Sequence, residues 1–327
     1  MKHDNLSSVT EFILLGISER PDQQIFLFFI FSLMYTITLA GNFAILAVTK
    51  ADPRLHKPMY FFLGTFSLVD IAFSSVTVPK ILINLLLESK AISFHGCFTQ
   101  LFFFMWFGSM EVLFLAVMAY DRYVAVCDPL HYTMIMKKTV CLQLVACSWV
   151  VSLLNALLHT VMTSQLSFCG PNTIHHFFCD IPPLMELSCS DIFINELVVF
   201  MEGGLVLLSP FLFIVLSYAQ IISTILKIRS KEGRRRTFST CSSHLAVVGL
   251  FYGTVLFMYF RPSSSFALDY DRVVSVVYTI VTPMLNPFIY TLRNKEMKDA
   301  LIKVFGCRKR SFRIKTATMI CVTKAHF

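Results

Sequence analysis

Three carboxylates stand inside long apolar stretches, where charged residues are rare. Asp70, Glu111 and Glu202 are each flanked mainly by apolar residues. A buried carboxylate of this kind must be paired, hydrated or neutralised by a proton. No Lys or Arg falls at the depth of Asp70 or Glu111, whereas Asn42 and Asn286 do. We expect Glu202, which is nearer one end of its stretch, to reach a polar interface; turned inward, it would favour amines or hydroxyls in a ligand.

A second set of residues resembles a metal site. His175, His176, Cys179 and Asp180 follow one another closely, and all are metal-ligand types. We expect no metal here, because Cys179 is a disulfide candidate and histidines are common in loops. HExxH and GxSxG motifs are absent, and the interior carboxylates have no nucleophile or metal-ligand set around them. We therefore expect no catalytic residue and no enzyme activity.

The elements that must hold these residues are membrane helices. The 327 residues are 56% hydrophobic and only 15% charged, which is more apolar surface than a soluble core can bury. The expected fold is an all-α membrane protein, a seven-transmembrane bundle within residues 25–292. Seven stretches are long enough to cross a bilayer; they are residues 25–49, 58–79, 97–120, 139–162, 197–226, 237–260 and 273–292.

The distribution of basic residues predicts the orientation. If residues 1–24 are extracellular, the inner segments 50–57, 121–138, 227–236 and 293–327 hold 3, 3, 6 and 10 of the 28 Lys and Arg. This excess satisfies the positive-inside rule. The sequon at Asn5 then lies outside, as glycosylation requires. The chain is thus expected to be a multi-pass plasma membrane protein with its C-terminus in the cytoplasm, and the net charge of +8 serves topology rather than nucleic acid.

Four of the ten cysteines fall on the predicted outer side. Cys97, Cys169, Cys179 and Cys189 allow three disulfide pairings, and the sequence does not choose among them. Three of the four belong to the loop 163–196. At least one bridge must therefore tie that loop to itself or to Cys97, which predicts a stapled lid over the bundle.

Motifs along the chain resemble those of the odorant receptors, a family within the rhodopsin-like G-protein-coupled receptors. The most specific is MAYDRYVAVCDPLHY at residues 118–132. Others in matching order are Gly41-Asn42, LHKPMYFFLGTFSLVD (55–70), VTVPK (76–80), HHFFCDIPPL (175–184), Ser217-Tyr218, TFSTCSSHL (237–245) and PMLNPFIYTLRNKEMKDAL (283–301). The chain departs from the family pattern at Lys57 and at Gly64-Thr65-Phe66.

The resemblance implies a signalling face on the cytosolic side. Asp121, Arg122 and Tyr123 resemble the latch that holds the resting state and receives a heterotrimeric stimulatory, olfactory-type G protein, which raises cyclic AMP. Two further pairs of residues resemble switch residues of the inner half of the bundle. One pair is Tyr218 and Tyr290, and the other is Asn286 and Pro287. Pro79, Pro210 and Pro287 interrupt the helix hydrogen bonds of spans two, five and seven and should kink them.

The same resemblance offers a role for the interior carboxylates. We expect Asp70 and Glu111 to share an allosteric sodium ion in the resting state. The competing hypothesis is that at least one of them is protonated. No other metal or cofactor is expected.

A ligand cavity is implied among spans three, five, six and seven. Helical spacing places Met105, Gly108 and Ser109 on one face of span three and Tyr252, Val255 and Tyr259 on one face of span six; core packing is the alternative interpretation. The resemblance adds Val206 and Thr279. Such an apolar, aromatic lining suits a small hydrophobic odorant.

The segment after the last span is predicted to lie on the inner membrane surface. Residues 294–305 have a short amphipathic pattern, typical of a cytosolic helix 8. Cys307 is a candidate for palmitoylation. A transporter or channel is the rival class, but it would normally show several interior charges or paired discontinuous helices.

Overall fold

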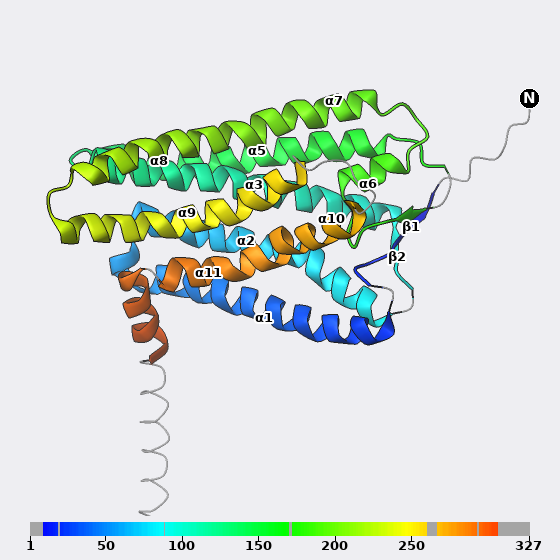
Figure 1. Ribbon diagram of the computed structural model, residues 1–327, viewed down its shortest axis with the longest axis horizontal. Coiled ribbons are helices and arrows are strands. Elements are labelled where there is room, and N and C mark those ends of the chain that lie inside the picture. Colours follow the sequence, from blue (N-terminus) through cyan, green and yellow to red (C-terminus); the bar gives the residue numbers. More distant parts are fainter. Residues whose placement is uncertain are drawn as a thin grey trace, which may run out of the picture.

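The computed structural model describes residues 9–18, 20–87, 89–169, 172–259, 267–292 and 294–306. Within these residues, seven helices are long and apolar enough to cross a membrane. They lie roughly side by side as one elongated bundle (Figure 1). A helix satisfies its own backbone hydrogen bonds, which is why apolar segments adopt it where water is absent. The predicted seven-helix fold is confirmed.

Four of the spans are continuous helices, and a fifth is continuous up to residue 259, where the described part of the chain is interrupted. The continuous spans are α1 (Pro21–Ala51), α2 (Pro58–Leu86), α3 (Phe94–Cys127) and α5 (Lys138–Ser164), and span six is α9 (Lys231–Tyr259). Each extends past its predicted span at one end or both, because the helices continue beyond the apolar stretch that marks them in the sequence; α2 begins at its predicted residue, and α9 ends one residue before its predicted limit.

Spans five and seven each contain a π-helical segment. Span five consists of α7 (Phe193–Glu202), η2 (Gly203–Leu208) and α8 (Ser209–Lys227), and span seven of α10 (Ala267–Val276), η3 (Val277–Val281) and α11 (Thr282–Leu292). Pro210 lies in the first turn of α8, two residues after the end of η2, and Pro287 lies inside α11. Short π segments often occur at functional sites, and both of these lie where the sequence predicts ligand-binding residues.

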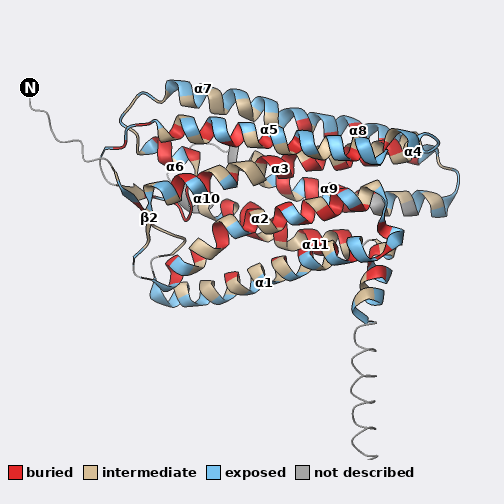
Figure 2. Cartoon of the chain, turned by 180° about the vertical axis from the view of Figure 1, so that it is seen from behind, coloured by how far each residue is buried: buried red, intermediate tan, exposed pale blue. Residues whose placement is uncertain are grey.

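The bundle carries apolar side chains outward and polar ones inward. Large apolar residues such as Phe200 and Leu226 are 78% and 68% exposed. Asn42, Asp70, Glu111 and other polar residues are buried. The outer faces of α1, α5 and α7 are largely exposed, while buried positions face the interior (Figure 2). Hydrocarbon, rather than water, is the solvent that suits this surface.

One end of the bundle is covered by a lid. A small sheet of order β2-β1-β3 is formed by β1 (Glu11–Leu14), β2 (Ala91–Ser93) and β3 (Thr173–Ile174), with β1 antiparallel to β2 and parallel to β3. The short helix α6 (Ile181–Glu186) completes it. The sequence analysis predicted a stapled lid but no strands, because segments of two to four residues carry too little pattern. We call this the lid end.

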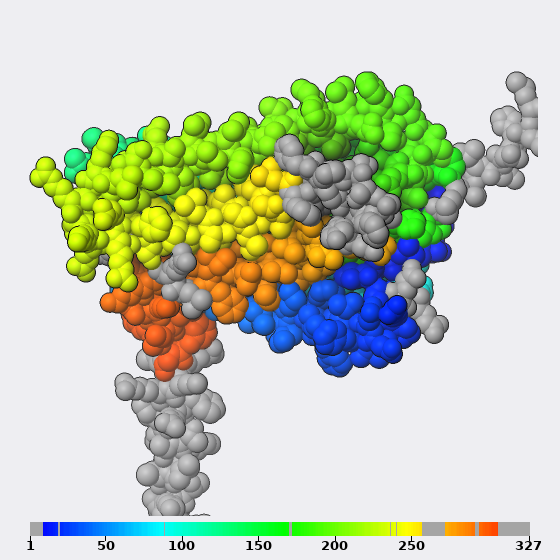
Figure 3. All heavy atoms as spheres, viewed as in Figure 1, coloured from blue at the N-terminus to red at the C-terminus, as the bar shows by residue number. Residues whose placement is uncertain are grey.

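The opposite end, which we call the Arg122 end, carries short elements. These are η1 (Pro53–Leu55), α4 (Tyr132–Ile135) and a helix over residues 295–306. The last turns steeply away from the bundle axis after α11 (Figure 1). It buries Met297 and Ala300 and exposes Ile302 and Phe305. A helix therefore follows the last span, next to the ends of α9 and α11 that lie at the Arg122 end (Figure 3). That it lies on the inner membrane surface stays a prediction.

Candidate functional site

A buried polar group occupies the middle of the bundle. Asp70 and Glu111 are both fully buried. The amide nitrogen of Asn286 donates to both carboxylate oxygens of Asp70, at 3.0 and 3.2 Å. Glu111 lies against Asp70, with which it interacts electrostatically and, when one of the two carboxyl groups carries a proton, by a side-chain hydrogen bond. No other described residue donates to either Glu111 oxygen. The structure thus brings Asp70, Glu111 and Asn286 together as the sequence predicts.

Asn42 and Pro287 complete this region from α1 and α11. A proline has no N–H, so Pro287 leaves the carbonyl of Pro283, four residues earlier, without its helical donor. The amide of Asn42 donates to that carbonyl at 3.2 Å. A Cβ on Gly41 would stand 2.9 Å from the Cβ of Pro287. The Gly41-Asn42 motif is therefore explained by packing: glycine permits the approach, and asparagine satisfies the orphaned carbonyl.

Arg122 borders an open cavity at the end of the bundle opposite the lid. This cavity has a volume of about 1100 Å³ and is also lined by residues from α2, α9 and the 295–306 helix. A second cavity of about 20 Å³, with room for roughly one water, is bordered by Arg122, His244 and Tyr290. The hydroxyl of Tyr290 is buried without a hydrogen-bond partner in the described part of the chain. It is thus available to bond a rearranged neighbour.

The latch predicted around Arg122 has an additional member. Asp121 accepts a hydrogen bond from the hydroxyl of Tyr132 at 2.8 Å. No ion pair joins Arg122 to a carboxylate among the described residues, although Arg122 and Asp121 interact electrostatically. Tyr123 is partly buried and packs against the buried apolar core of the bundle. The roles of Asp121, Arg122 and Tyr123 in a latch stay predictions.

His244 ties three spans together near this end, and the sequence analysis gave it no role. Its Nδ1 lies 2.8 Å from the hydroxyl of Tyr218 in α8, and its Nε2 lies 3.1 Å from the carbonyl oxygen of Leu115 in α3. Since a carbonyl only accepts, Nε2 carries the proton and Tyr218 donates to Nδ1. His244 is 1% exposed. A histidine within an apolar span was the available signal.

The residues predicted to line a ligand cavity lie in the lid half of the bundle. Two of them occupy the π segments, Val206 in η2 and Thr279 in η3. Tyr252 is buried, and its hydroxyl donates to the carbonyl of Leu207 in η2 at 3.3 Å. Met105, Gly108 and Val255 are partly buried, and the side chain of Tyr259 lies outside the described residues. These roles stay predictions.

Ser109, another of these residues, belongs to a polar cluster that includes Glu202. Asn155 of α5 donates through one amide nitrogen to Ser109, at 3.0 Å, and to Glu202, at 2.9 Å. His159 lies 3.6 Å from the second carboxylate oxygen of Glu202. The expectation that Glu202 reaches the outer interface is wrong, because its carboxylate is turned toward α5, where two polar side chains meet it.

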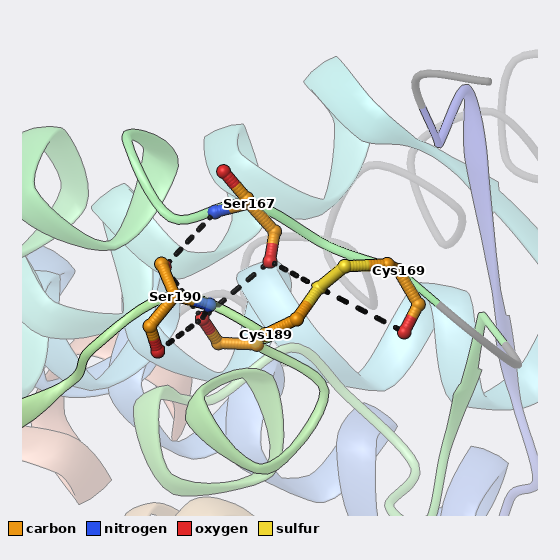
Figure 4. The surroundings of a disulfide bond; sticks show 5 residues. Ser167, Cys169, Cys189 and Ser190 are labelled. Atoms are coloured by element: carbon orange, nitrogen blue, oxygen red, sulfur yellow. Dashed lines mark hydrogen bonds between the residues drawn. A yellow bond between two sulfur atoms is a disulfide. The ribbon is translucent and has the colours of Figure 1, made fainter. Parts of the chain in front are cut away.

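The lid holds the four predicted disulfide cysteines in two bridges. Cys97 pairs with Cys179, and Cys169 pairs with Cys189. The second bridge lies beside hydrogen bonds from the Cys189 N–H to the Ser167 carbonyl and from the Ser167 N–H to the Ser190 hydroxyl (Figure 4). The first ties the loop to the start of α3. Both bridges agree with the prediction of a disulfide-linked lid. Of the three pairings that the sequence leaves open, the structure contains this one.

His176 and Asp180, on either side of Cys179, have separate hydrogen-bond partners. His176 is buried, and its Nε2 lies 3.2 Å from the hydroxyl of Ser275 in α10. Burial, and to a lesser degree Arg272, lowers the pKa of His176 to about 3. Burial raises the pKa of Asp180 to about 6, while its hydrogen bond from the Ile181 N–H opposes this rise. The ring of Phe178 packs at a tilt against that of Phe104 in α3, so the loop closes this end of the bundle.

The fold and these interior groups define a seven-helix, multi-pass membrane protein with a polar interior. The profile of the olfactory receptor family matches residues 31–309. Olfactory receptor 1f45 of Rattus norvegicus is 54% identical over 94% of this chain and 98% of its own length. Olfactory receptor 1F1 of Homo sapiens is likewise 54% identical, over 94% of this chain and 98% of its own.

The chain therefore belongs to the olfactory receptor family, whose members are receptors rather than enzymes. Asn5, Cys307 and the tail after Lys309 lie outside the described residues.

Proposed function

We propose that this chain is an odorant receptor that binds small hydrophobic molecules inside the bundle and activates a stimulatory, olfactory-type G protein, raising cyclic AMP. The observation that carries the proposal is the His244 bridge, which fastens span six to spans three and five beside Arg122. A contact of this kind is a switch: it holds one arrangement of span six and can be released.

The lid end is assigned to the outside and the Arg122 end to the cytosol. Disulfides form in oxidising compartments, and both bridges lie at the lid end. The basic residues of the connections at the Arg122 end favour the cytosol. If Asn5 is glycosylated, Asn5→Gln will remove a glycosidase-sensitive mass shift; a shift that persists in the variant would exclude Asn5 as the acceptor.

The odorant site is assigned to the region between α3, η2, α9 and η3. The π segments place Val206 and Thr279 on a less regular backbone than a straight α-helix would. Ser109 and the Asn155–Glu202 pair supply hydrogen-bonding groups at one side of this region. Apolar contacts from Met105, Val255 and Tyr252 supply the remainder. An odorant with an apolar body and one hydrogen-bonding group fits this chemistry.

Activation is a shift between two populations. Odorant bound near η2 and η3 favours an arrangement in which the inner half of span six moves outward. This movement separates His244 from Tyr218 and Leu115 and opens the cavity at Arg122 to the G protein. The free hydroxyls of Tyr218 and Tyr290 then become partners for Arg122.

A sodium ion fits the polar group at the centre. Sodium is a hard cation that prefers oxygen ligands. The oxygens of Asn42 and Asn286 that lack hydrogen-bond partners among the described residues, together with the carboxylate oxygens of Asp70 and Glu111, supply such ligands. The ion would neutralise the buried carboxylates in the resting state. Unchanged resting activity and unchanged sodium sensitivity in Asp70→Asn would contradict this site.

The decisive test measures cyclic AMP in cells that express the chain with the olfactory-type G protein. A diverse odorant panel is applied, and Arg122→Ala at matched surface expression is the control. We expect a response to at least one small hydrophobic odorant, and its loss in the variant. A response that Arg122→Ala retains would contradict coupling through Arg122, and ligand-gated ion flux without G protein would favour a channel.

A further inference from the structure

A groove opens on the outer surface at the Arg122 end, away from the interior site. It has a volume of about 700 Å³ and runs between α1, α2 and the α4–α5 segment. Leu46, Phe61, Thr65 and Leu68 are among its walls. Phe61 and Leu68 are 40% and 46% exposed. The volume is in the range of small-molecule sites, yet the groove faces the side where a bilayer surrounds the bundle.

The groove spans one leaflet of a membrane. It starts at Pro58, the first residue of α2, and reaches Leu68. At about 1.5 Å per residue, these ten positions cover about 15 Å along the helix, which is about half of a hydrocarbon core roughly 30 Å thick. An acyl chain that enters from the headgroup level therefore finds apolar walls over its leaflet.

The mouth of the groove is strongly basic. Lys50, Lys57, Lys137 and Lys138 line it, together with His56, and all five are exposed. Lys57 forms an ion pair with Glu296 at 2.8 Å. The other three lysines have no ion pair among the described residues, and the described lining contains no carboxylate. Three helix ends thus gather positive charge that the protein does not neutralise.

We propose that this groove binds an anionic phospholipid of the cytosolic leaflet. The headgroup phosphate meets Lys50, Lys137 and Lys138, and an acyl chain lies along Phe61 and Leu68. A sterol or a neutral phospholipid would use the walls but leave the lysines without a partner. A second copy of this chain would bring the same positive charge to the same place and be repelled.

The groove also touches the signalling end. Tyr132 lines it, and the hydroxyl of the same residue donates to Asp121 beside Arg122. Lipid in the groove therefore contacts a side chain that positions Asp121. This assignment of leaflet rests on the orientation proposed above, but the binding itself does not, because it requires neither odorant nor G protein.

The test is native mass spectrometry of the purified receptor in detergent with equimolar phosphatidylserine and phosphatidylcholine. We expect phosphatidylserine adducts in excess over phosphatidylcholine adducts. In Lys137→Gln with Lys138→Gln, we expect the phosphatidylserine affinity to fall by about 25-fold at low ionic strength, from roughly fivefold for each lysine near an anionic headgroup. Thr65→Trp, which fills the groove, should reduce binding without removing charge.

The matched control is Lys227→Gln with Arg229→Gln. This variant removes two exposed charges at the same end of the bundle but outside the groove, and it should keep the affinity of the unaltered receptor. Equal losses in both double variants would mean diffuse attraction and would overturn the site. Equal binding of the two lipids, or receptor dimers that Thr65→Trp abolishes, would also overturn it. Loss of odorant response with lipid binding intact would count only against the receptor mechanism.

Discussion

The hydroxyl of Tyr218 and Nδ1 of His244 lie 2.8 Å apart and join span five to span six. The opposite nitrogen of the same imidazole reaches the Leu115 carbonyl of span three. One side chain of span six therefore holds both neighbouring spans, and its movement must break two hydrogen bonds.

Removing this bridge should raise activity without ligand. His244→Leu abolishes both hydrogen bonds of the resting arrangement, each of which contributes about 1 kcal/mol. Losing one to two such bonds changes the ratio of active to resting receptor by about 5-fold to about 30-fold. The measurement is basal cyclic AMP at matched surface expression.

Thr254→Ala is the control for that experiment. Among the described residues, its hydroxyl bonds only carbonyls of its own helix, those of Leu250 and Phe251, so basal cyclic AMP should stay unchanged. Basal activity that falls in His244→Leu, with normal surface expression, would show that the bridge belongs to the active arrangement instead.

A methyl group between α1 and α11 should destabilise the receptor. In Gly41→Ala, the new Cβ meets the Pro287 Cβ at 2.9 Å, and overpacking of this kind costs about 1–3 kcal/mol. The apparent melting temperature in detergent should fall. Gly253→Ala is the matched control, because nothing lies within 4 Å of its Cβ; an equal fall in both variants would contradict the proposed cause.

Changing Glu202 should alter which ligands are preferred. Glu202→Gln keeps an acceptor for Asn155 at 2.9 Å but removes the charge facing His159. We expect weaker responses to amines and alcohols relative to purely apolar odorants, measured as a change in the ranking of half-maximal concentrations. Ser209→Ala serves as control, since its hydroxyl bonds the carbonyl of Leu205 within span five. An unchanged ranking in Glu202→Gln would remove Glu202 from the ligand site.

The lid should lose stability in acid through His176. The pKa of His176 is about 3 in the folded protein, compared with 6.5 for an ordinary histidine. The unfolded chain therefore binds the extra proton below pH 6.5, and stability falls as the pH falls from there toward 3, by about 2 kcal/mol at pH 5. The apparent melting temperature at pH 7 and pH 5 measures this, and His176→Gln should reduce the difference.

Asp180 acts in the opposite direction and supplies the comparison. Its pKa of about 6 in the folded protein lies above the 3.8 of an ordinary aspartate, so Asp180 favours the folded state as the pH falls from 6 to 4. Asp180→Asn should therefore increase the acid sensitivity of the receptor. If both variants showed the pH dependence of the unaltered receptor, the lid would not be the part that titrates.

The sequence by itself determined the seven spans, their order and the family. Span length and apolar composition are local properties that a bilayer requires, so they can be recognised in the sequence without knowledge of the tertiary structure. Asp70, Glu111 and Asn286 were also grouped correctly, because a buried charge requires partners and few polar residues share its depth. The choice between disulfide pairings was not available, since three of them satisfy the same counts.

Only the tertiary structure decided how the helices face one another. It turned Glu202 toward Asn155 and His159, placed His244 between Tyr218 and Leu115, and set Asn42 against the carbonyl that Pro287 leaves free. These contacts join residues about 26 to 241 positions apart in the chain. The rotation of an apolar helix about its own axis does not change its intrinsic helix propensity, so the local sequence does not determine it. It is fixed by packing between the spans and by the need of each buried polar atom for a hydrogen-bond partner.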